Sequence, residues 1–166
     1  MHKNETAPDA RCDASIDRRL AAARQLARDG RIDEARHQWH SALAMRSNDG
    51  EFLCRVATAM HECGLLDDAI GLYRLALPSS NKLSWTHNNL GVALRAKGQF
   101  PEALAQFMQA CQLAPNDVDI ITNAANAHKA LGQFDAAVAA YRRALRLRPH
   151  VDAHVNLGNL LQKLGQ

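Results

Sequence analysis

Apolar residues in this chain form two short runs at helical spacing, and a polar turn separates the two runs. In residues 84–117 the first run includes Leu90 and Leu94, and the second includes Phe100 and Phe107. Residues three, four and seven positions apart lie on one face of an α-helix. The pattern therefore predicts two amphipathic helices that are joined by a tight turn.

This two-helix block returns along the whole chain. Spacings of 34, 34, 34 and 33 residues separate the glycines of the predicted turns, which are Gly30, Gly64, Gly98, Gly132 and Gly165. Glycine suits this place because it readily adopts the positive φ that ends a helix. A period of this length is typical of a solenoid, in which each unit packs on its neighbours. We therefore expect an all-α solenoid.

Residue size repeats with the same period. Small residues mark the expected helix crossings, at Ala23, Ala57, Gly91, Ala125 and Gly158 in the first helices and at Ala35, Ala69, Ala103 and Ala137 in the second. A column of large aromatic residues, expected to fill the space between hairpins, contains Trp39, Tyr73, Phe107 and Tyr141. Prolines close two of the units, and Pro78 is expected to shorten the second helix of another.

With this period and these small, aromatic and proline positions, the chain resembles the tetratricopeptide repeat family. The resemblance divides it into a flexible tail, four full units and a terminal half unit, at residues 1–15, 16–49, 50–83, 84–117, 118–150 and 151–166. It implies a right-handed superhelix whose first helices line a concave groove. It also implies that the groove binds a peptide or a partner protein, and that the domain is not catalytic.

Composition narrows the functional classes. Hydrophobic residues make up 47% and aromatic residues 5% of the chain, which suits closely packed helices. No apolar run is long enough to span a membrane, the four cysteines form no Cys-x-x-Cys pair, and the formal net charge is +3. We therefore expect a cytoplasmic protein with no membrane segment, no nucleic-acid partner, no metal and no other cofactor.

Asparagine recurs on the face of the first helices that the resemblance places in the groove. The residues concerned are Asn88, Asn89, Asn123, Asn126, Asn156 and Asn159. Asparagine is a poor residue for a helix interior, so its repetition there costs stability. A carboxamide both donates and accepts hydrogen bonds, which suits contact with the backbone of an extended peptide. The alternative interpretation is that these amides bond neighbouring helices.

Charged and aromatic residues complete the expected groove. Arg55, together with Arg24, makes its N-terminal half more basic, and Trp85 is a large aromatic residue at a position on the lip of the groove. One lip is expected to carry the cations Arg95, Lys129 and Lys163, and the other lip the acids Asp119 and Asp152. This division favours a ligand of mixed charge or of none. Tryptophan and arginine are enriched at binding hot spots, so Trp85 has two interpretations, ligand recognition or packing on the neighbouring unit.

Two known uses of such repeats differ in what they require. The asparagine column and the segment HVNLGNLLQKLG are similar to the repeat regions of O-linked N-acetylglucosamine transferases. That resemblance implies that the column grips substrate backbones and delivers them to a glycosyltransferase domain. The carboxylate clamp of chaperone cochaperones needs lysines at positions where this chain has acids, namely Glu51, Asp119 and Asp152. We therefore expect no clamp for a C-terminal carboxylate.

Other clusters do not indicate chemistry. The histidine pairs His37 with His40 and His150 with His154 have ligand spacing but lack a third ligand nearby. We predict a non-catalytic scaffold that binds an extended peptide segment, as the N-terminal region of a larger bacterial protein such as a repeat-containing glycosyltransferase. The alternative is a free-standing adaptor or secretion chaperone that covers an apolar segment of its partner.

The last predicted helix, residues 151–165, has apolar residues on more than one face. Its leucines are Leu157, Leu160, Leu161 and Leu164. They cannot all be buried against the preceding unit, and solenoids normally end in a polar outer face. We therefore expect a weak homodimer through this helix.

Overall fold

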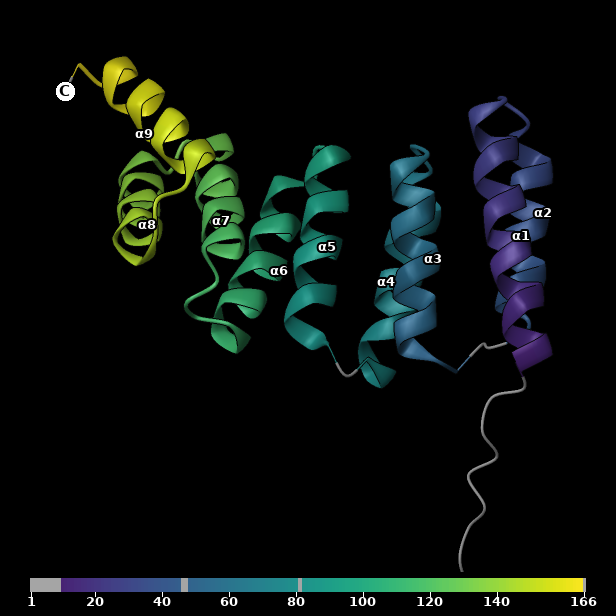
Figure 1. Cartoon of the computed structure of the whole chain (residues 1–166). Helices are drawn as coiled ribbons and strands as arrows, with labels where there is room; N and C mark the ends of the chain where they lie inside the picture. Colours follow the sequence, from purple (N-terminus) through teal and green to yellow (C-terminus); the bar gives the residue numbers. More distant parts are fainter. Residues whose placement is uncertain (1–9, 46–47, 81, 166) are drawn as a thin grey trace, which may run out of the picture.

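The computed structural model describes residues 10–45, 48–80 and 82–165, and these residues contain α-helices, one short 3₁₀-helix and no strand. The α-helices are α1 (Ala10–Arg28), α2 (Ile32–Leu43), α3 (Gly50–Glu62), α4 (Leu66–Ala76), α5 (Leu83–Ala96), α6 (Phe100–Leu113), α7 (Val118–Ala130), α8 (Phe134–Leu147) and α9 (Val151–Lys163) (Figure 1). Each odd-numbered helix up to α7 pairs with the next helix as a hairpin. The all-helical fold predicted from the sequence is confirmed.

The hairpins stack in one row that runs from α1 to α9 (Figure 1). Each first helix contacts the first helix of the next unit, along the series α1, α3, α5, α7 and α9. Within the described residues, the second helices make no such close backbone contacts with one another, although ion pairs join α2 to α4 and α4 to α6. The first helices therefore form the inner, concave side of the solenoid, and the second helices form its outer side.

The turns of the hairpins adopt the predicted conformation. Gly98 has a φ of 79°, and the four other turn glycines are also in the left-handed region. The N–H of Gln99 donates to the Leu94 carbonyl at 2.9 Å, and the N–H of Gly98 donates to the Arg95 carbonyl at 2.9 Å. These two bonds satisfy carbonyls that the end of α5 leaves without helical partners.

Side chains at the helix starts satisfy the backbone as well. The Asp117 carboxylate accepts the backbone N–H groups of Asp119 and Ile120 at the start of α7. The Asp49 carboxylate accepts the N–H of Phe52 at 3.0 Å at the start of α3. Such caps stabilise a helix by roughly 0.5–2 kcal/mol relative to alanine.

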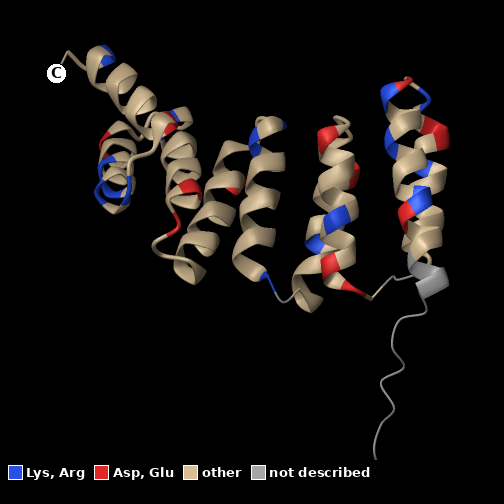
Figure 2. Ribbon diagram, viewed as in Figure 1, with Lys and Arg blue, Asp and Glu red and all other residues tan. Residues whose placement is uncertain are grey.

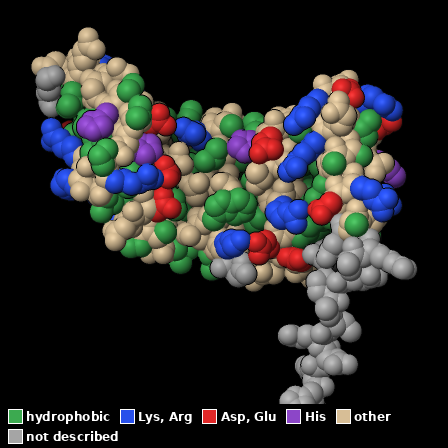
Figure 3. All heavy atoms as spheres, in the orientation of Figure 1, with side chains coloured by type: hydrophobic (Ala, Val, Ile, Leu, Met, Phe, Trp, Pro, Cys, Tyr) green, Lys and Arg blue, Asp and Glu red, His purple; other side chains and the backbone are tan. Residues whose placement is uncertain are grey.

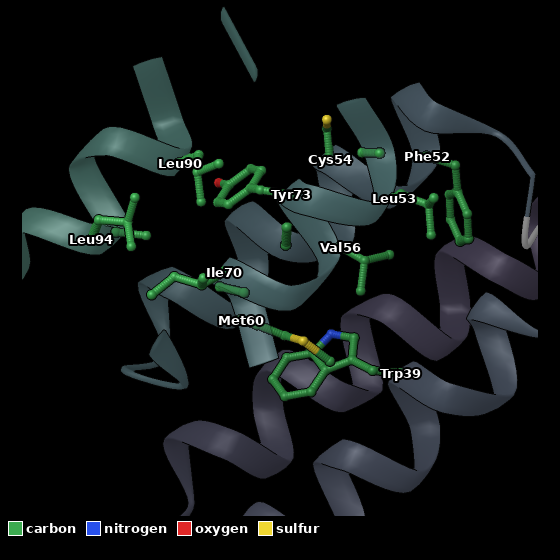
Figure 4. Packing of buried hydrophobic residues seen from close by; sticks show 14 of the residues in the cluster. Trp39, Phe52, Leu53, Cys54, Val56, Met60, Ile70, Tyr73, Leu90 and Leu94 are labelled. Carbon is green, nitrogen blue, oxygen red and sulfur yellow. The ribbon is translucent and has the colours of Figure 1, made fainter. Parts of the chain in front are cut away.

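The aromatic column forms the centre of each hairpin, and all four of its members are buried. Figure 4 shows Trp39 and Tyr73 in a cluster that also contains Met60 and Leu90, so the core is continuous across the first three units, and a second buried cluster around Tyr141 follows it. The small residues allow this packing. A Cβ atom at Gly91 would lie only 2.7 Å from the Phe107 ring.

Unit two departs from the regular repeat, as Pro78 predicted. α4 ends at Ala76, and the 3₁₀-helix η1 (Leu77–Ser79) follows it. η1 lies directly against the start of α3, because a Cβ atom at Gly50 would be 2.5 Å from the backbone carbon of Ser79. A glycine at residue 50 is therefore what allows η1 to pack there.

Two expectations about the ends of the chain require correction. α1 begins at Ala10, so residues 10–15 are helical rather than part of a flexible tail, while residues 1–9 lie outside the described residues. Gly158 was expected at a close helix crossing. Nothing lies within 4 Å of a Cβ atom built there, because no second helix packs on that side of α9 among the described residues.

Candidate functional site

Amide side chains are linked to one another on the concave side, between α5 and α7. The Asn123 Nδ2 atom donates to Asn88 Oδ1 at 3.0 Å, and the Asn88 Nδ2 atom lies 3.4 Å from Asn89 Oδ1. We call these three residues the amide chain. All three are half-buried. The amide chain spans two units, and the Nδ2 atom of Asn89 and the Oδ1 atom of Asn123 remain at its two ends.

The other asparagines of the predicted stripe have different surroundings. Asn126 Oδ1 accepts the phenol hydroxyl of Tyr141 at 2.5 Å, and Asn156 Oδ1 accepts the Lys129 ammonium at 2.7 Å. Asn159 is exposed and lines a cavity of about 480 Å³ near Lys163. Several of the asparagines thus bond neighbouring helices, as the alternative interpretation expected.

Trp85 lies at the edge of a cavity of about 390 Å³ between α3 and α5. Its side chain is 41% exposed, so it combines packing with an accessible ring face. The remaining lining residues are Glu51, Cys54, Arg55, Ser80 and Lys82. We call this cavity the Trp85 pocket. Figure 3 shows the face of the first helices, with hydrophobic side chains near its middle.

The walls of the Trp85 pocket are held by polar contacts. Lys82 Nζ contacts Glu51 Oε1 at 2.6 Å, and Arg55 contacts Asp17 Oδ1 at 3.3 Å. The buried Thr86 hydroxyl lies 3.3 Å from the Cys54 sulfur. Burial raises the pKa of the Cys54 thiol, with a smaller opposing effect from the hydrogen bond to Thr86. The thiol is therefore protonated at physiological pH, so Cys54 contributes no charge to the lining of the pocket.

A second cavity, of about 630 Å³, lies near the C-terminal ends of α3, α5 and α7. Its lining residues are His61, Val92, Arg95, Ala96, Phe100, Asn126, Lys129, Ala130 and Asn156, and none of them is acidic. We call this cavity the basic pocket. The structure thus brings four of the predicted groove residues, Arg95, Asn126, Lys129 and Asn156, to one place.

The cations of the basic pocket influence one another. Burial lowers the pKa of the Lys129 ammonium, and the neighbouring Arg95 charge lowers it further. Burial also lowers the pKa of His61, while Glu62 raises it and Arg95 lowers it. Burial and the Arg95 charge thus disfavour the positive form of both side chains, whereas Glu62 favours it at His61.

The acidic lip is partly compensated within the protein. Asp119 contacts Arg148 at 2.9 Å and His150 Nε2 at 2.8 Å. Glu51 is paired with Lys82, as described above. These acids are therefore compensated within the protein, whereas Arg95 and Lys129 have no carboxylate partner among the residues that the structure describes. Asp152, the other acid predicted for this lip, is exposed and has no ion-pair partner among the described residues, so the groove keeps unpaired charges of both signs.

Sequence reasoning missed these pairs at the acidic lip. Lys82 follows Glu51 by 31 residues, and His150 follows Asp119 by the same 31 residues. Because the two separations are equal, the acids occupy one position of the 34-residue repeat in both units, and their basic partners occupy another position, 31 residues later. Comparing pairs of positions between repeats, rather than single columns, would have revealed this signal.

Charged residues are unevenly distributed over the solenoid. Figure 2 shows them concentrated on α1, α3 and α8, with few on α5 and α6.

His87 Nδ1 lies 2.8 Å from Gln106 Oε1, and His128 Nδ1 lies 2.6 Å from Gln133 Oε1, so both histidines bond glutamines. In the described part of the chain, no three His, Cys, Asp or Glu side chains are grouped so that they could hold a metal ion.

The last helix presents apolar residues on two sides. Leu160 is 2% exposed, whereas Val151 and Val155 are 76% and 55% exposed. Leu164 is exposed as well. The expected surplus of apolar surface on α9 is therefore present, and it includes two valines that the sequence analysis did not name. Association through α9 stays a prediction.

Among the described residues, no helix has the length and apolar character that crossing a membrane requires.

Comparison with known families identifies the repeat. A model described as tetratricopeptide repeat matches residues 20–83, and a model described as TPR repeat matches residues 93–132 and 125–165. Together these matches cover most of the chain. No curated protein matches it significantly.

Several solved structures share the fold. MamA 41-end from Desulfovibrio magneticus RS-1 has a TM-score of 0.74 at 19% identity, over 91% of this chain and 86% of that one. The pilF structure from Pseudomonas aeruginosa has a TM-score of 0.70 at 21% identity, over 92% and 70% of the two chains. The first TPR of Spaghetti (RPAP3), bound to the HSP90 peptide SRMEEVD, has a TM-score of 0.68 at 21% identity, over 71% and 94%.

Proposed function

This chain belongs to the tetratricopeptide repeat family, and we propose that it is an interaction scaffold whose concave side binds an extended peptide segment of a partner protein. The observation that carries the proposal is the amide chain of Asn88, Asn89 and Asn123, which joins α5 and α7. An extended peptide presents N–H and C=O groups along its length, and carboxamides at both ends of the amide chain match these groups without selecting a sequence.

The surroundings of the amide chain support the same proposal. The Trp85 pocket lies between α3 and α5, and the basic pocket lies across α3, α5 and α7. An extended ligand along the concave side would therefore contact an aromatic ring and a charged site besides the amides. The fold is also used in this way elsewhere, since the Spaghetti domain is bound to a peptide.

The wider context of the chain is a finer part of the proposal. The asparagine column supports a role as the N-terminal region of a larger bacterial protein, such as a repeat-containing glycosyltransferase. The alternative is a free-standing adaptor or secretion chaperone, and the partly exposed Trp85 ring suits an apolar segment of its partner. Peptides selected by the groove distinguish the two, because backbone recognition tolerates many sequences whereas an apolar client requires hydrophobic residues.

An array of immobilised extended peptides, probed with the purified chain, tests the proposal. The test variant replaces Asn89, Asn123 and Asn156 with alanine. The control variant, Gln109→Ala with Gln112→Ala, removes two exposed amides from α6 on the outer side. Each lost hydrogen bond is worth roughly 0.5–1.5 kcal/mol net, so the test variant should bind the selected peptides at least about tenfold more weakly.

Calorimetric titration of the selected peptides gives these affinities, and thermal melts show whether each variant remains folded. The control variant should bind like the unmodified chain. If the test variant binds normally, the amides serve to bond helices, and the proposed site is wrong. An array on which no peptide is retained would contradict peptide binding altogether.

A further inference from the structure

We infer that the segment bound in the groove is acidic, and that one of its carboxylate side chains enters the basic pocket of His61, Arg95 and Lys129. This inference rests on the proposed function, and it adds the chemical class of the partner. The position differs from that of a clamp for a C-terminal carboxylate, because it lies at the other lip from Glu51 and Asp119.

Charge compensation elsewhere in the protein isolates the basic pocket. Most ion pairs of the described residues join two units or two helices, as in Arg36 with Asp68 at 2.9 Å and Arg148 with Asp119 at 2.9 Å. Arg95 and Lys129 are half-buried, yet in the part of the chain that the structure describes neither has a carboxylate partner. An anion from outside the chain is the missing complement.

Because the cations lie close together, a bound anion would also relieve the repulsion between them. Burial lowers the pKa of both Lys129 and His61, and the charge of Arg95 lowers both further, while Glu62 opposes the effect at His61. Like charges that are held together away from water raise the free energy of the empty pocket. A carboxylate between them would replace this repulsion with charge-assisted hydrogen bonds, which are stronger than neutral ones.

The shape and lining of the basic pocket fit a side chain on an extended backbone. Its volume is about 630 Å³, and Val92 and Phe100 contribute apolar surface for methylene groups. Asn126 and Asn156 contribute carboxamides to its lining, and Asn126 lies about one helical turn from Asn123 of the amide chain on α7. A peptide that bonds the amide chain can therefore reach the pocket, and Arg95 can offer its guanidinium to a carboxylate in a two-bond arrangement.

The same three cations could instead serve only to stabilise the helices, and this alternative predicts a different result for the variants. His61, Arg95 and Lys129 lie in the last turns of α3, α5 and α7. Cations there stabilise the helix dipole by roughly 0.3–1 kcal/mol each. If that were their whole role, removing the charges would lower the stability of the fold and leave ligand binding unchanged.

The test compares two synthetic peptides with blocked ends, which carry no terminal charge. The acidic peptide contains Asp and Glu between Gly and Ser residues, and the neutral peptide has Asn and Gln in their places. The test variant is Arg95→Gln with Lys129→Gln. The control variant, Arg142→Gln with Arg146→Gln, makes the same change in net charge at exposed positions of α8.

The unmodified chain should bind the acidic peptide at least about tenfold more tightly than the neutral one, and added salt should reduce the difference. The test variant should lose that preference and still bind the neutral peptide, whereas the control variant should keep it. Calorimetry gives the affinities, and thermal melts show that the variants are folded.

The outcomes separate this inference from the proposed function. Equal binding of both peptides by the unmodified chain, or an acidic preference that survives in the test variant, overturns the inference and leaves peptide binding intact. If the control variant loses the preference for the acidic peptide to the same extent, the preference arises from the net charge of the chain, and the inference is overturned as well. Binding of neither peptide, together with an empty array, contradicts the proposed function itself.

Discussion

The phenol hydroxyl of Tyr141 donates a hydrogen bond to Asn126 Oδ1 at 2.5 Å, from the second helix of its unit to the first. Tyr73 and Thr58 make the corresponding contact at 2.8 Å, and both pairs are separated by 15 residues. The repeat thus contains a polar tie between its two helices that is present in two units. In unit three the same positions hold Val92 and Phe107, so the tie is replaced there by apolar contact.

This relationship predicts how the free energy of unfolding changes when the hydrogen bond is removed from one unit or introduced into another. Tyr141→Phe removes one bond and should reduce the free energy of unfolding by about 1 kcal/mol. Phe107→Tyr buries a hydroxyl opposite Val92 and should cost about 1–3 kcal/mol. Adding Val92→Thr to Phe107→Tyr recreates the pair seen in unit two, so the double variant should recover much of that loss. Denaturant unfolding of the three variants measures these differences, and additive effects in the double variant would exclude the tie.

A second prediction concerns two glycines at the same position of the repeat. Gly91→Ala places a methyl group 2.7 Å from the Phe107 ring, so we expect a loss of about 1–3 kcal/mol. Gly158→Ala meets nothing within 4 Å and improves helix propensity, so we expect a gain of about 0.8–1 kcal/mol. Thermal or denaturant unfolding gives both values. A destabilised Gly158→Ala variant would show that α9 is packed more closely than the structure indicates.

The two tyrosines provide a direct spectroscopic prediction, because they are the only ones in the sequence. Burial raises the pKa of Tyr73 and of Tyr141 to about 12, from an ordinary value near 10. The fold thus favours the neutral phenol. This contribution to stability is fully present below about pH 10 and is lost as the pH rises through about 12.

Phenolate absorbance should therefore rise near pH 12 in the folded chain and near pH 10 in denaturant. Tyr73→Phe and Tyr141→Phe should each remove about half of the signal, since each variant retains one phenol. Circular dichroism followed over the same pH range shows whether the helices melt together with the titration. A folded chain that titrates near pH 10 would contradict burial of these hydroxyls.

The periodic sequence was enough to predict the helices, their turns and most of the core. Gly98 and Phe107 show why, since a turn glycine and a buried aromatic residue repeat at fixed places and their local roles do not depend on distant residues. The contact of η1 with Gly50 could not be predicted in this way. Pro78 indicated that α4 would end early, but the direction of the following backbone depends on packing against another helix.

The candidate site was predictable as a stripe but not as a set of contacts. The column of asparagines placed Asn126 on the first helix, but its orientation toward Tyr141 depends on the side-chain conformation. The charge left at the acidic lip was also not predicted, because Asp119 is compensated by Arg148 and His150 from the other end of the same unit. Single columns of a repeat reveal which faces are polar, and pairs of columns are needed to find which charges remain unpaired.

Successive first helices make close backbone contacts, whereas second helices are joined by ion pairs between side chains, and this difference has a mechanical consequence. Each junction can rotate slightly about the inner helices, because the outer ion pairs of Arg36 with Asp68 and of Arg74 with Glu102 stretch or break more readily than close backbone packing within the described residues. Such rotations add along the array, so small changes at each junction alter the curvature of the groove considerably. We therefore expect an elastic groove, in which a peptide bound as proposed would set the radius of the superhelix as well as occupy it.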